Sequence, residues 1–439
     1  MKTADASGIV PLQEYLADNA GRFFPALADR PVKAQLTQAT RRRFSHNYFF
    51  TLLADGQRHD VFVKVPVASA AQECLSSNGE PEGHTAPEDR AVAGLPTEPP
   101  CPTEGLQWGL GIDSESLRIP PAPQDRPRLV PLLPISREVE LEHAALIAMG
   151  KHFAQISDPQ LQAPRVLGAT DAGAIVIQSV RLPTLADVIR RSNPWRVPPA
   201  DNELFSAFHL AGRWLNVFHG MPQLDHAQPR LDSRDQLVQQ FEEFSAYLVR
   251  TGGPQGLLDK YQAQFTDVVE AVLPIDLPLV TGHGDFGLHN IFFGRISGGQ
   301  TAAIGFDTLA CWQTSAYEDL AYFLLLLETL PPLFVRRSVA CREATVLACR
   351  REFLRGYFGS DAVPLDALRL YEILVAMDKW VSAVHSARRA TGLRGVVKKC
   401  RLALQHRALH GRIEKLFSQS RPTAAELVTE RPRELETAI

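Results

Sequence analysis

The sequence lacks several features that would place the protein in a specialised class. Its six cysteines are scattered and none forms a Cys-x-x-Cys pair, so neither a zinc site nor a disulfide framework is indicated. The formal net charge is only -3, which argues against general nucleic-acid binding. No apolar run reaches membrane-spanning length, since the leucine-rich stretch 323–327 ends at Glu328. The first residues lack the apolar core of a signal peptide. We therefore expect a cytoplasmic protein.

The remaining composition is that of a globular protein. Hydrophobic residues make up 45% of the chain and charged residues 22%. A chain of 439 residues is long enough for a large core and two lobes. Function must therefore be sought in local motifs.

The most informative motif is His-Gly-Asp-Phe-Gly-Leu-His-Asn at residues 283–290, followed by Ile-Gly-Phe-Asp at residues 304–307. Phosphoryl transfer needs a carboxylate that orients the attacking hydroxyl, an amide that holds a magnesium ion, and a second carboxylate that grips the metal at the nucleotide phosphates. Asp285, Asn290 and Asp307 occur in that order and could fill those roles.

The local pattern around this motif brings its parts together. The apolar residues 277–281 predict a strand that leads into the loop, and His283 would brace that loop. A second short strand at 290–294, a glycine turn at 298–299 and a return strand at 301–306 predict a hairpin. Taken singly, the polar residues could be turn and strand-end caps. Together their spacing favours a catalytic site.

Residues 283–290 resemble the His-x-Asp-x-x-x-x-Asn loop of the aminoglycoside phosphotransferase and choline kinase-like family, whose members are relatives of protein kinases. Phe306 and Asp307 resemble that family's Ile-Asp-Trp metal-binding strand end. Residues 317–321 resemble its Pro-x-x-Asp-Leu-Ala segment, whose aspartate supports the catalytic loop. The similarity runs in order from about residue 34 to residue 380.

The resemblance implies a two-lobed, protein kinase-like α+β fold, with a small antiparallel-sheet N-lobe and a larger, mainly helical C-lobe. It also implies Mg²⁺-dependent transfer of the γ-phosphate of ATP, or of GTP, to a hydroxyl of a small molecule or glycan. We expect a helical extension at 1–31, an N-lobe at 32–180, a C-lobe at 181–417 and a flexible tail at 418–439.

The N-lobe contains a lysine within an apolar strand. Residues 32–67 read as consecutive strands with a hairpin at Asp55-Gly56, and Lys64 lies in Val-Phe-Val-Lys-Val. It could be an edge-strand lysine that faces solvent, or the phosphate-binding lysine of a kinase small lobe. Its place before the catalytic motif favours the second interpretation.

Such a lysine needs a carboxylate partner from a helix. Residues 136–149 have helical spacing, with Ser136 as a possible N-cap and acidic residues in the early turns. The distance from Glu142 to the following strand resembles the family spacing, so we choose Glu142 and keep Glu138 in reserve. Both could instead be solvated surface residues.

The loop expected to cover the nucleotide phosphates, residues 39–47, contains no glycine. Ser45-His46-Asn47 is a partial match to the family's Gly-x-Ser-Asn pattern, so Ser45 and Asn47 are the expected nucleotide contacts. Backbone amides in a turn can still bind phosphate. The missing glycine also favours an alternative, a nucleotide-binding pseudokinase that recruits a partner.

Two further segments complete the N-lobe. Residues 69–134 are crowded with proline, glutamate, serine and glycine, which predicts a long, partly disordered insertion. The strand at 174–180 resembles the part of the family fold that precedes the interlobe hinge. By that resemblance the backbone at Gln178 and Val180 would contact the adenine, although an ordinary strand-to-helix connection is equally compatible.

The C-lobe is predicted to be mainly helical, with helices at 207–219, 234–250, 257–272, 317–330, 342–357, 365–384 and 397–417. His219 is expected to be a buried structural histidine. Residues 388–415 are rich in lysine and arginine, which indicates a solvated helix or a platform for an anionic substrate or glycan. The second interpretation argues against a cationic aminoglycoside acceptor.

Overall fold

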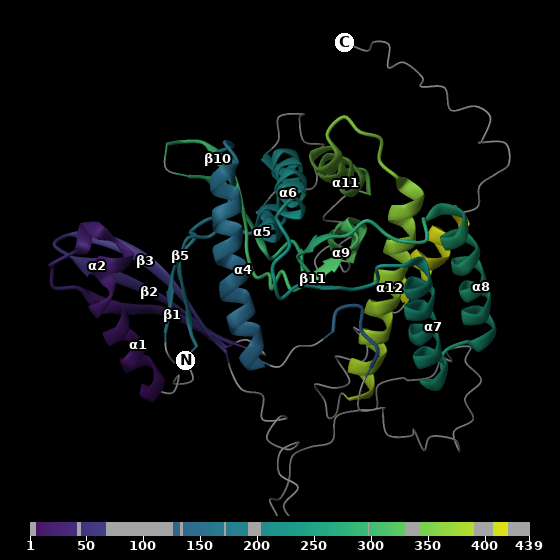
Figure 1. The fold of residues 1–439 in the computed structure, drawn as a ribbon, viewed down its shortest axis with the longest axis horizontal. Coiled ribbons are helices and arrows are strands. Elements are labelled where there is room, and N and C mark those ends of the chain that lie inside the picture. Colours follow the sequence, from purple (N-terminus) through teal and green to yellow (C-terminus); the bar gives the residue numbers. More distant parts are fainter. Residues whose placement is uncertain are drawn as a thin grey trace, which may run out of the picture. The chain divides into compact units, whose positions relative to one another are not determined.

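The computed structural model describes residues 6–41, 45–66, 126–131, 135–170, 173–191, 203–296, 298–329, 343–389 and 407–419 (Figure 1). The fold class predicted from the sequence is confirmed. An antiparallel sheet with three short helical segments comes first, and a larger, mainly helical part follows.

Five strands form the N-terminal sheet, in the order β1-β2-β3-β6-β5, and every pair of neighbours is antiparallel. The strands are β1 (Lys33–Arg41), β2 (Ser45–Ala54), β3 (Gln57–Pro66), β5 (Val166–Ala169) and β6 (Ile175–Gln178). The turn between β2 and β3 is Asp55-Gly56, and both residues have positive φ, 46° and 77°. A two-residue hairpin turn requires this conformation, which explains the Asp-Gly pair.

The two faces of β3 have different surroundings. Val61 and Val63 are fully buried in a core that one face of the sheet shares with α1 (Ala6–Asp18), α2 (Ala20–Phe23) and the 3-10 helix η1 (Pro25–Leu27). Because side chains alternate along a strand, Phe62 and Lys64 point to the opposite face. That face borders a cavity.

The helical part is built from paired helices. Its helices are α4 (Ile135–Gln155), α5 (Leu185–Arg191), α6 (Glu203–His219), α7 (Arg234–Arg250), α8 (Gln255–Val272), α9 (Ala316–Thr329), α11 (Glu343–Phe358), α12 (Leu365–Arg388) and a helix at 407–419. Helix α6 packs on α11, α9 on α12, and α7 on α8. Figure 1 shows α7 and α8 next to α12.

Helices α6 and α11 approach each other at two glycines. A Cβ at Gly212 would lie 2.0 Å from the Phe353 carbonyl oxygen, and one at Gly356 would lie 2.0 Å from the His209 carbonyl oxygen. Any side chain would collide with backbone there, so this close packing depends on both glycines.

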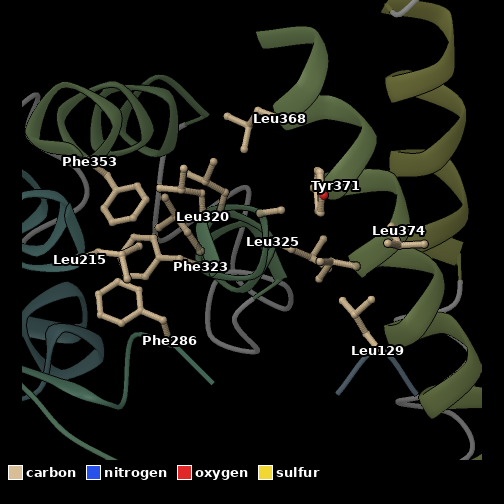
Figure 2. Packing of buried hydrophobic residues seen from close by; sticks show 14 of the residues in the cluster. Leu129, Leu215, Phe286, Leu320, Phe323, Leu325, Phe353, Leu368, Tyr371 and Leu374 are labelled. Atoms are coloured by element: carbon tan, nitrogen blue, oxygen red, sulfur yellow. The ribbon is translucent and has the colours of Figure 1, made fainter. Parts of the chain in front are cut away.

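Aromatic side chains connect this core to the catalytic motif. Phe323 of α9 stacks on Phe353 of α11 with ring centroids 3.9 Å apart, and Phe286 stacks on Phe323 at 5.3 Å (Figure 2). Trp214 of α6 also stacks on Phe286, with ring centroids 5.6 Å apart. Phe286 lies within the motif at 283–290, so the core fixes the middle of the loop.

Two small sheets position the ends of the motif. One has the order β4-β10-β9 and the other β7-β11-β8. Their strands are β4 (Leu161–Gln162), β9 (Ile291–Arg295), β10 (Thr301–Gly305), β7 (Gln228–Pro229), β8 (Val280–Gly282) and β11 (Trp312–Thr314). β9 and β10 form the expected hairpin, with Gly305 opposite Ile291. Asn290 and Asp307 therefore lie at the same end of it.

Some predictions fall outside the described residues. They include most of the insertion at 69–134, of which the structure describes 126–131, part of the helix at 397–417, most of the tail at 418–439, and the Glu138 side chain. In the ranges that the structure does describe, none of the helices combines the length and the hydropathy needed to cross a membrane.

Candidate active site

The loop at 283–290 connects β8 to β9 and is held by a buried carboxylate. The backbone N–H groups of His283 and Gly284 donate to Asp319 of α9, at 2.6 and 3.0 Å. His219 of α6 is buried and its Nε2 lies 3.1 Å from Asp319 Oδ2. Gly284 has φ +80°, a conformation that favours glycine. Asp319 therefore supports the loop through its backbone.

Asp285 extends from this loop into the cavity. Asn290 Nδ2 donates to Asp285 Oδ2 at 3.1 Å and to its carbonyl oxygen at 2.9 Å. The Tyr322 hydroxyl donates to Asp285 Oδ1 at 2.5 Å. The surrounding protein raises the pKa of Asp285 above its ordinary value by desolvation, which outweighs the hydrogen bond from Tyr322. A carboxylate with a raised pKa is a better proton acceptor.

Asp307 follows β10 and meets the lysine of β3. Lys64 Nζ donates to Asp307 Oδ1 at 2.5 Å and to Glu142 Oε1 of α4 at 2.9 Å. Burial alone would lower the pKa of Lys64, but the two carboxylates raise it above its ordinary value, so the lysine is charged. Asp307 has φ +65°, which is uncommon outside glycine and is often found at functional sites.

The two halves of the site are joined through the β9–β10 hairpin. The Phe306 N–H donates to the Asn290 carbonyl oxygen at 3.0 Å, next to Asp307. The structure thus brings together Asp285, Asn290 and Asp307 with Lys64 of β3 and Glu142 of α4. All five side chains line one cavity of about 980 Å³.

Ser45 and Asn47 lie on the strand next to the lysine. Asn47 is directly opposite Lys64 in the β2–β3 pairing, and Ser45 Oγ donates to Asn47 Oδ1 at 2.9 Å. Both residues line the cavity. The glycine-free segment therefore places polar side chains near the lysine.

The two residues of the expected hinge, Gln178 and Val180, lie outside the cavity lining. The Gln178 N–H donates to the Arg165 carbonyl oxygen at 2.9 Å, and Val180 follows the end of β6. The β6 side chains that line the cavity are instead Ile175 and Ile177, which make an apolar wall. The cavity lining among the described residues does not include Gln178 or Val180.

His283 braces the loop with its ring as well as its backbone. The side chain is buried between Phe218 and Phe286, each with a ring centroid 5.3 Å away. Its ring nitrogens have no hydrogen-bond partner among the described residues. Desolvation lowers the pKa of His283, so the ring is neutral and acts by packing.

The donor set suits a hard cation with few protein ligands. Mg²⁺ prefers oxygen and is usually held by one or two carboxylates together with substrate phosphates. Asn290 and Asp307 offer an amide and a carboxylate oxygen at the end of the hairpin. The described ranges hold no cluster of three His, Cys, Asp or Glu residues that could bind a metal alone. The residues present therefore fit a cation shared with a nucleotide.

Sequence reasoning missed Tyr322, Lys379 and Arg126, which also line the cavity. Tyr322 lies three residues after Asp319 on α9, so helical spacing could have indicated that the two share a face. No local signal marks Lys379 of α12 or Arg126, since each reaches the cavity only through tertiary packing.

A sequence model described as the phosphotransferase enzyme family matches residues 128–368, which is more than half of the chain. A comparison with curated proteins finds no match.

Three solved structures illustrate the fold likeness. The aminoglycoside phosphotransferase APH(2″)-IIa in a ternary complex with streptomycin and ATP has 10% identity and a TM-score of 0.43, covering 95% of this chain and 99% of that chain. Choline kinase from Cryptosporidium parvum Iowa II has 9% identity and a TM-score of 0.44, covering 92% and 96%. Glucosamine kinase in complex with glucosamine, ADP and inorganic phosphate has 14% identity and a TM-score of 0.39, covering 95% and 99%. At these scores the likenesses indicate nothing about the substrate.

Proposed function

The chain belongs to the phosphotransferase enzyme family, and from this premise we propose that it transfers the γ-phosphoryl group of ATP, or of GTP, to a hydroxyl of a small molecule or glycan with Mg²⁺. The observation that carries the proposal is the convergence of Asp285, Asn290 and Asp307 with the Lys64–Glu142 pair around one cavity.

The nucleotide side of the site is the charged cluster at β3 and β10. Lys64 is held by Glu142, 2.9 Å away, and carries a positive charge that can bind phosphate oxygens. Asn290 and Asp307 would hold Mg²⁺, which when bound neutralises charge on the phosphates. Ile175, Ile177, Ser45 and Asn47 all line the cavity. In this proposal the two isoleucines would form an apolar wall for a purine ring, and Ser45 and Asn47 would contact the phosphates.

The acceptor side of the site is Asp285. Its carboxylate is fixed by Asn290 on one oxygen and by Tyr322 on the other, so its direction is set before an acceptor binds. The acceptor oxygen forms a bond to the γ-phosphorus as the bond between that phosphorus and the β,γ-bridging oxygen breaks. The hydroxyl proton passes to Asp285 and the nucleoside diphosphate leaves.

Asp285→Ala tests the assignment of the base. Turnover should fall by about 10²–10⁴, because general-base catalysis contributes that much, while nucleotide affinity stays nearly unchanged. Asp259→Asn, on the exposed surface of α8, is the matched control. Full activity in Asp285→Ala would remove this residue from the mechanism.

The second candidate, a nucleotide-binding pseudokinase, is favoured by the absence of glycine from residues 39–47. Incubation with radiolabelled ATP and Mg²⁺ distinguishes the phosphotransferase from the pseudokinase. The incubation is run with and without amino alcohols, sugars and antibiotics as acceptors. Transfer of label to any acceptor, or hydrolysis that requires Asp285, excludes the pseudokinase. Stoichiometric nucleotide binding without either reaction favours it.

A further inference from the structure

The segment 126–131 is fixed in the helical part next to the catalytic loop. The Leu129 N–H donates to Asp378 Oδ1 of α12 at 3.2 Å, and its carbonyl oxygen accepts from the buried Arg230 guanidinium. The Leu129 side chain is buried in the large hydrophobic cluster (Figure 2). Val130 Cγ1 lies 4.0 Å from the position that a Cβ on Gly284 would take. The segment therefore forms part of the cavity wall beside Asp285.

This segment brings Arg126 and Arg128 to the cavity wall, and α12 brings Lys379. Arg126 Nη1 lies 3.6 Å from Asp378 Oδ1 and also donates to Ser382 Oγ. Lys379 Nζ lies 4.2 Å from the centroid of the Tyr322 ring, and its nearest carboxylate oxygen, Asp378 Oδ2, is 3.9 Å away. Arg126 and Lys379 both line the cavity.

The carboxylates on this side are already engaged. Asp378 is shared between the Leu129 N–H, Arg126 and Lys379. Glu318 is paired with Arg230 and accepts from Thr314 Oγ1 at 2.9 Å. Asp319 holds the loop amides. Asp378 therefore serves both Arg126 and Lys379, and the other carboxylate that attracts Lys379 is the proposed base, Asp285.

Lys379 has unused donors at this point. An ammonium has three N–H donors, and within the described part of the chain Lys379 makes no hydrogen bond, only the two contacts above. Its side chain is 31% exposed, so it is reachable from the cavity. The Tyr322 ring under Lys379 carries the hydroxyl that donates to Asp285. Tyr322 therefore lies between Lys379 and the proposed base, and contacts both.

We propose that the acceptor carries an anionic group, a carboxylate or a phosphate monoester, and that Lys379 binds this group with Arg126 in support while the hydroxyl meets Asp285. This inference rests on the proposed function. The surrounding protein partly desolvates the Lys379 ammonium, which lowers the pKa of Lys379. A hydrogen bond from the ammonium to an anionic ligand would offset this desolvation. In this arrangement Lys379 binds the anionic group of the acceptor, and Asp285 binds the hydroxyl of the same molecule next to the nucleotide phosphates.

The direct test is calorimetric titration of inorganic phosphate into the full chain saturated with Mg²⁺ and the β,γ-imido analogue of ATP. The filled nucleotide site leaves the acceptor side as the place for phosphate. Lys379→Met should weaken this binding by about tenfold or more, since a hydrogen bond to a charged group contributes at least that much. Lys379→Arg should retain it. Lys260→Met, on the exposed surface of α8, should match the wild type.

A second titration distinguishes the two anions. D-Gluconate, D-glucose 6-phosphate, D-glucose and D-glucosamine, which share a six-carbon sugar scaffold, are each tested as competitors of phosphate binding. Stronger competition by gluconate assigns a carboxylate, and stronger competition by glucose 6-phosphate assigns a phosphate monoester. Competition by glucosamine equal to that of the anions, or failure of both anions to compete, overturns the proposal.

Other outcomes are equally decisive. Phosphate binding that is absent in the wild type, or unchanged in Lys379→Met with a native melting curve, overturns the proposal. The proposed function is checked separately by ATP hydrolysis in the wild type. Phosphate binding at Lys379 without hydrolysis or transfer would keep the anion site and reject the phosphotransferase reaction.

Discussion

Removal of the Tyr322 hydroxyl should change the pH at which the enzyme loses activity. This hydroxyl donates to Asp285 Oδ1 at 2.5 Å. The bond favours the ionised carboxylate and so lowers the pKa of Asp285, whereas desolvation, the largest influence, and the Asp307 charge raise it. In Tyr322→Phe the opposing hydrogen bond is gone, and the pKa of Asp285 should rise further.

The size of the shift follows from the strength of the bond. A hydrogen bond to a charged group contributes about 1.5–3 kcal/mol, and one pKa unit corresponds to about 1.4 kcal/mol. Asp285 is exposed to the cavity, so water can replace part of the lost bond. The full bond corresponds to about 1–2 pKa units, and replacement by water reduces the expected rise in the pKa of Asp285 to about 0.5–1 unit.

The measurement is the pH profile of kcat/KM from about pH 4 to 9, whose acid limb reports the base of the free enzyme. A base with a higher pKa is protonated at higher pH, so the acid limb of Tyr322→Phe should move toward neutral pH. Tyr317→Phe, on the same helix, removes a hydroxyl that does not contact Asp285 and is the control. An acid limb that stays in place, or moves to lower pH, would show that Asp285 is not the titrating base.

Four further changes have defined outcomes. Glu142→Gln should weaken nucleotide binding in calorimetry by about tenfold, because it removes one of the two carboxylates that hold Lys64; the exposed Glu140→Gln is the control, and equal affinities would contradict the pairing. Gly212→Ala should lower the free energy of unfolding in urea by at least about 1–3 kcal/mol, because the new methyl would collide with α11. Gly150→Ala in α4 meets nothing within 4 Å and should raise it by about 0.5–1 kcal/mol. Asp319→Asn should make the free energy of unfolding depend less on pH in the acid range. Burial would raise the pKa of Asp319, but its hydrogen bonds to His219 and to the loop hold that pKa below the ordinary 3.8. The ionised carboxylate therefore stabilises the fold above pH 3.8, and this stabilisation is lost as the pH falls through the lower pKa of the folded state. Equal midpoints of acid unfolding in the wild type and in Asp319→Asn would refute this.

Local sequence was informative wherever a short pattern imposes geometry. The Asp55-Gly56 pair has the positive φ angles of a two-residue hairpin, as expected from its residue types. Alternation in β3 puts Val61 and Val63 on the buried face and Lys64 on the other. The glycines at 298–299 both have positive φ and close the hairpin that leads to Asp307.

The contacts between distant segments were harder to predict. Lys64 is 78 residues from Glu142 and 243 residues from Asp307, and helical spacing alone left Glu138 as an equal candidate. The choice of Glu142 came from a family spacing. The hinge residues Gln178 and Val180 were named from the same resemblance, and they remain predictions.

Residue order and periodicity were sufficient to predict the strand that carries Lys64, the hairpin that ends at Asp307, and the division into a sheet and a helical part. They did not reveal that Lys379 lies against Tyr322 beside Asp285, or that Arg126 lines the same cavity. Periodicity specifies which face of a helix or strand is apolar, but not which distant element covers that face. That is decided by packing, here by the burial of Leu129 and by the aromatic core around Phe286, which fix the segment 126–131 and the catalytic loop at the same cavity.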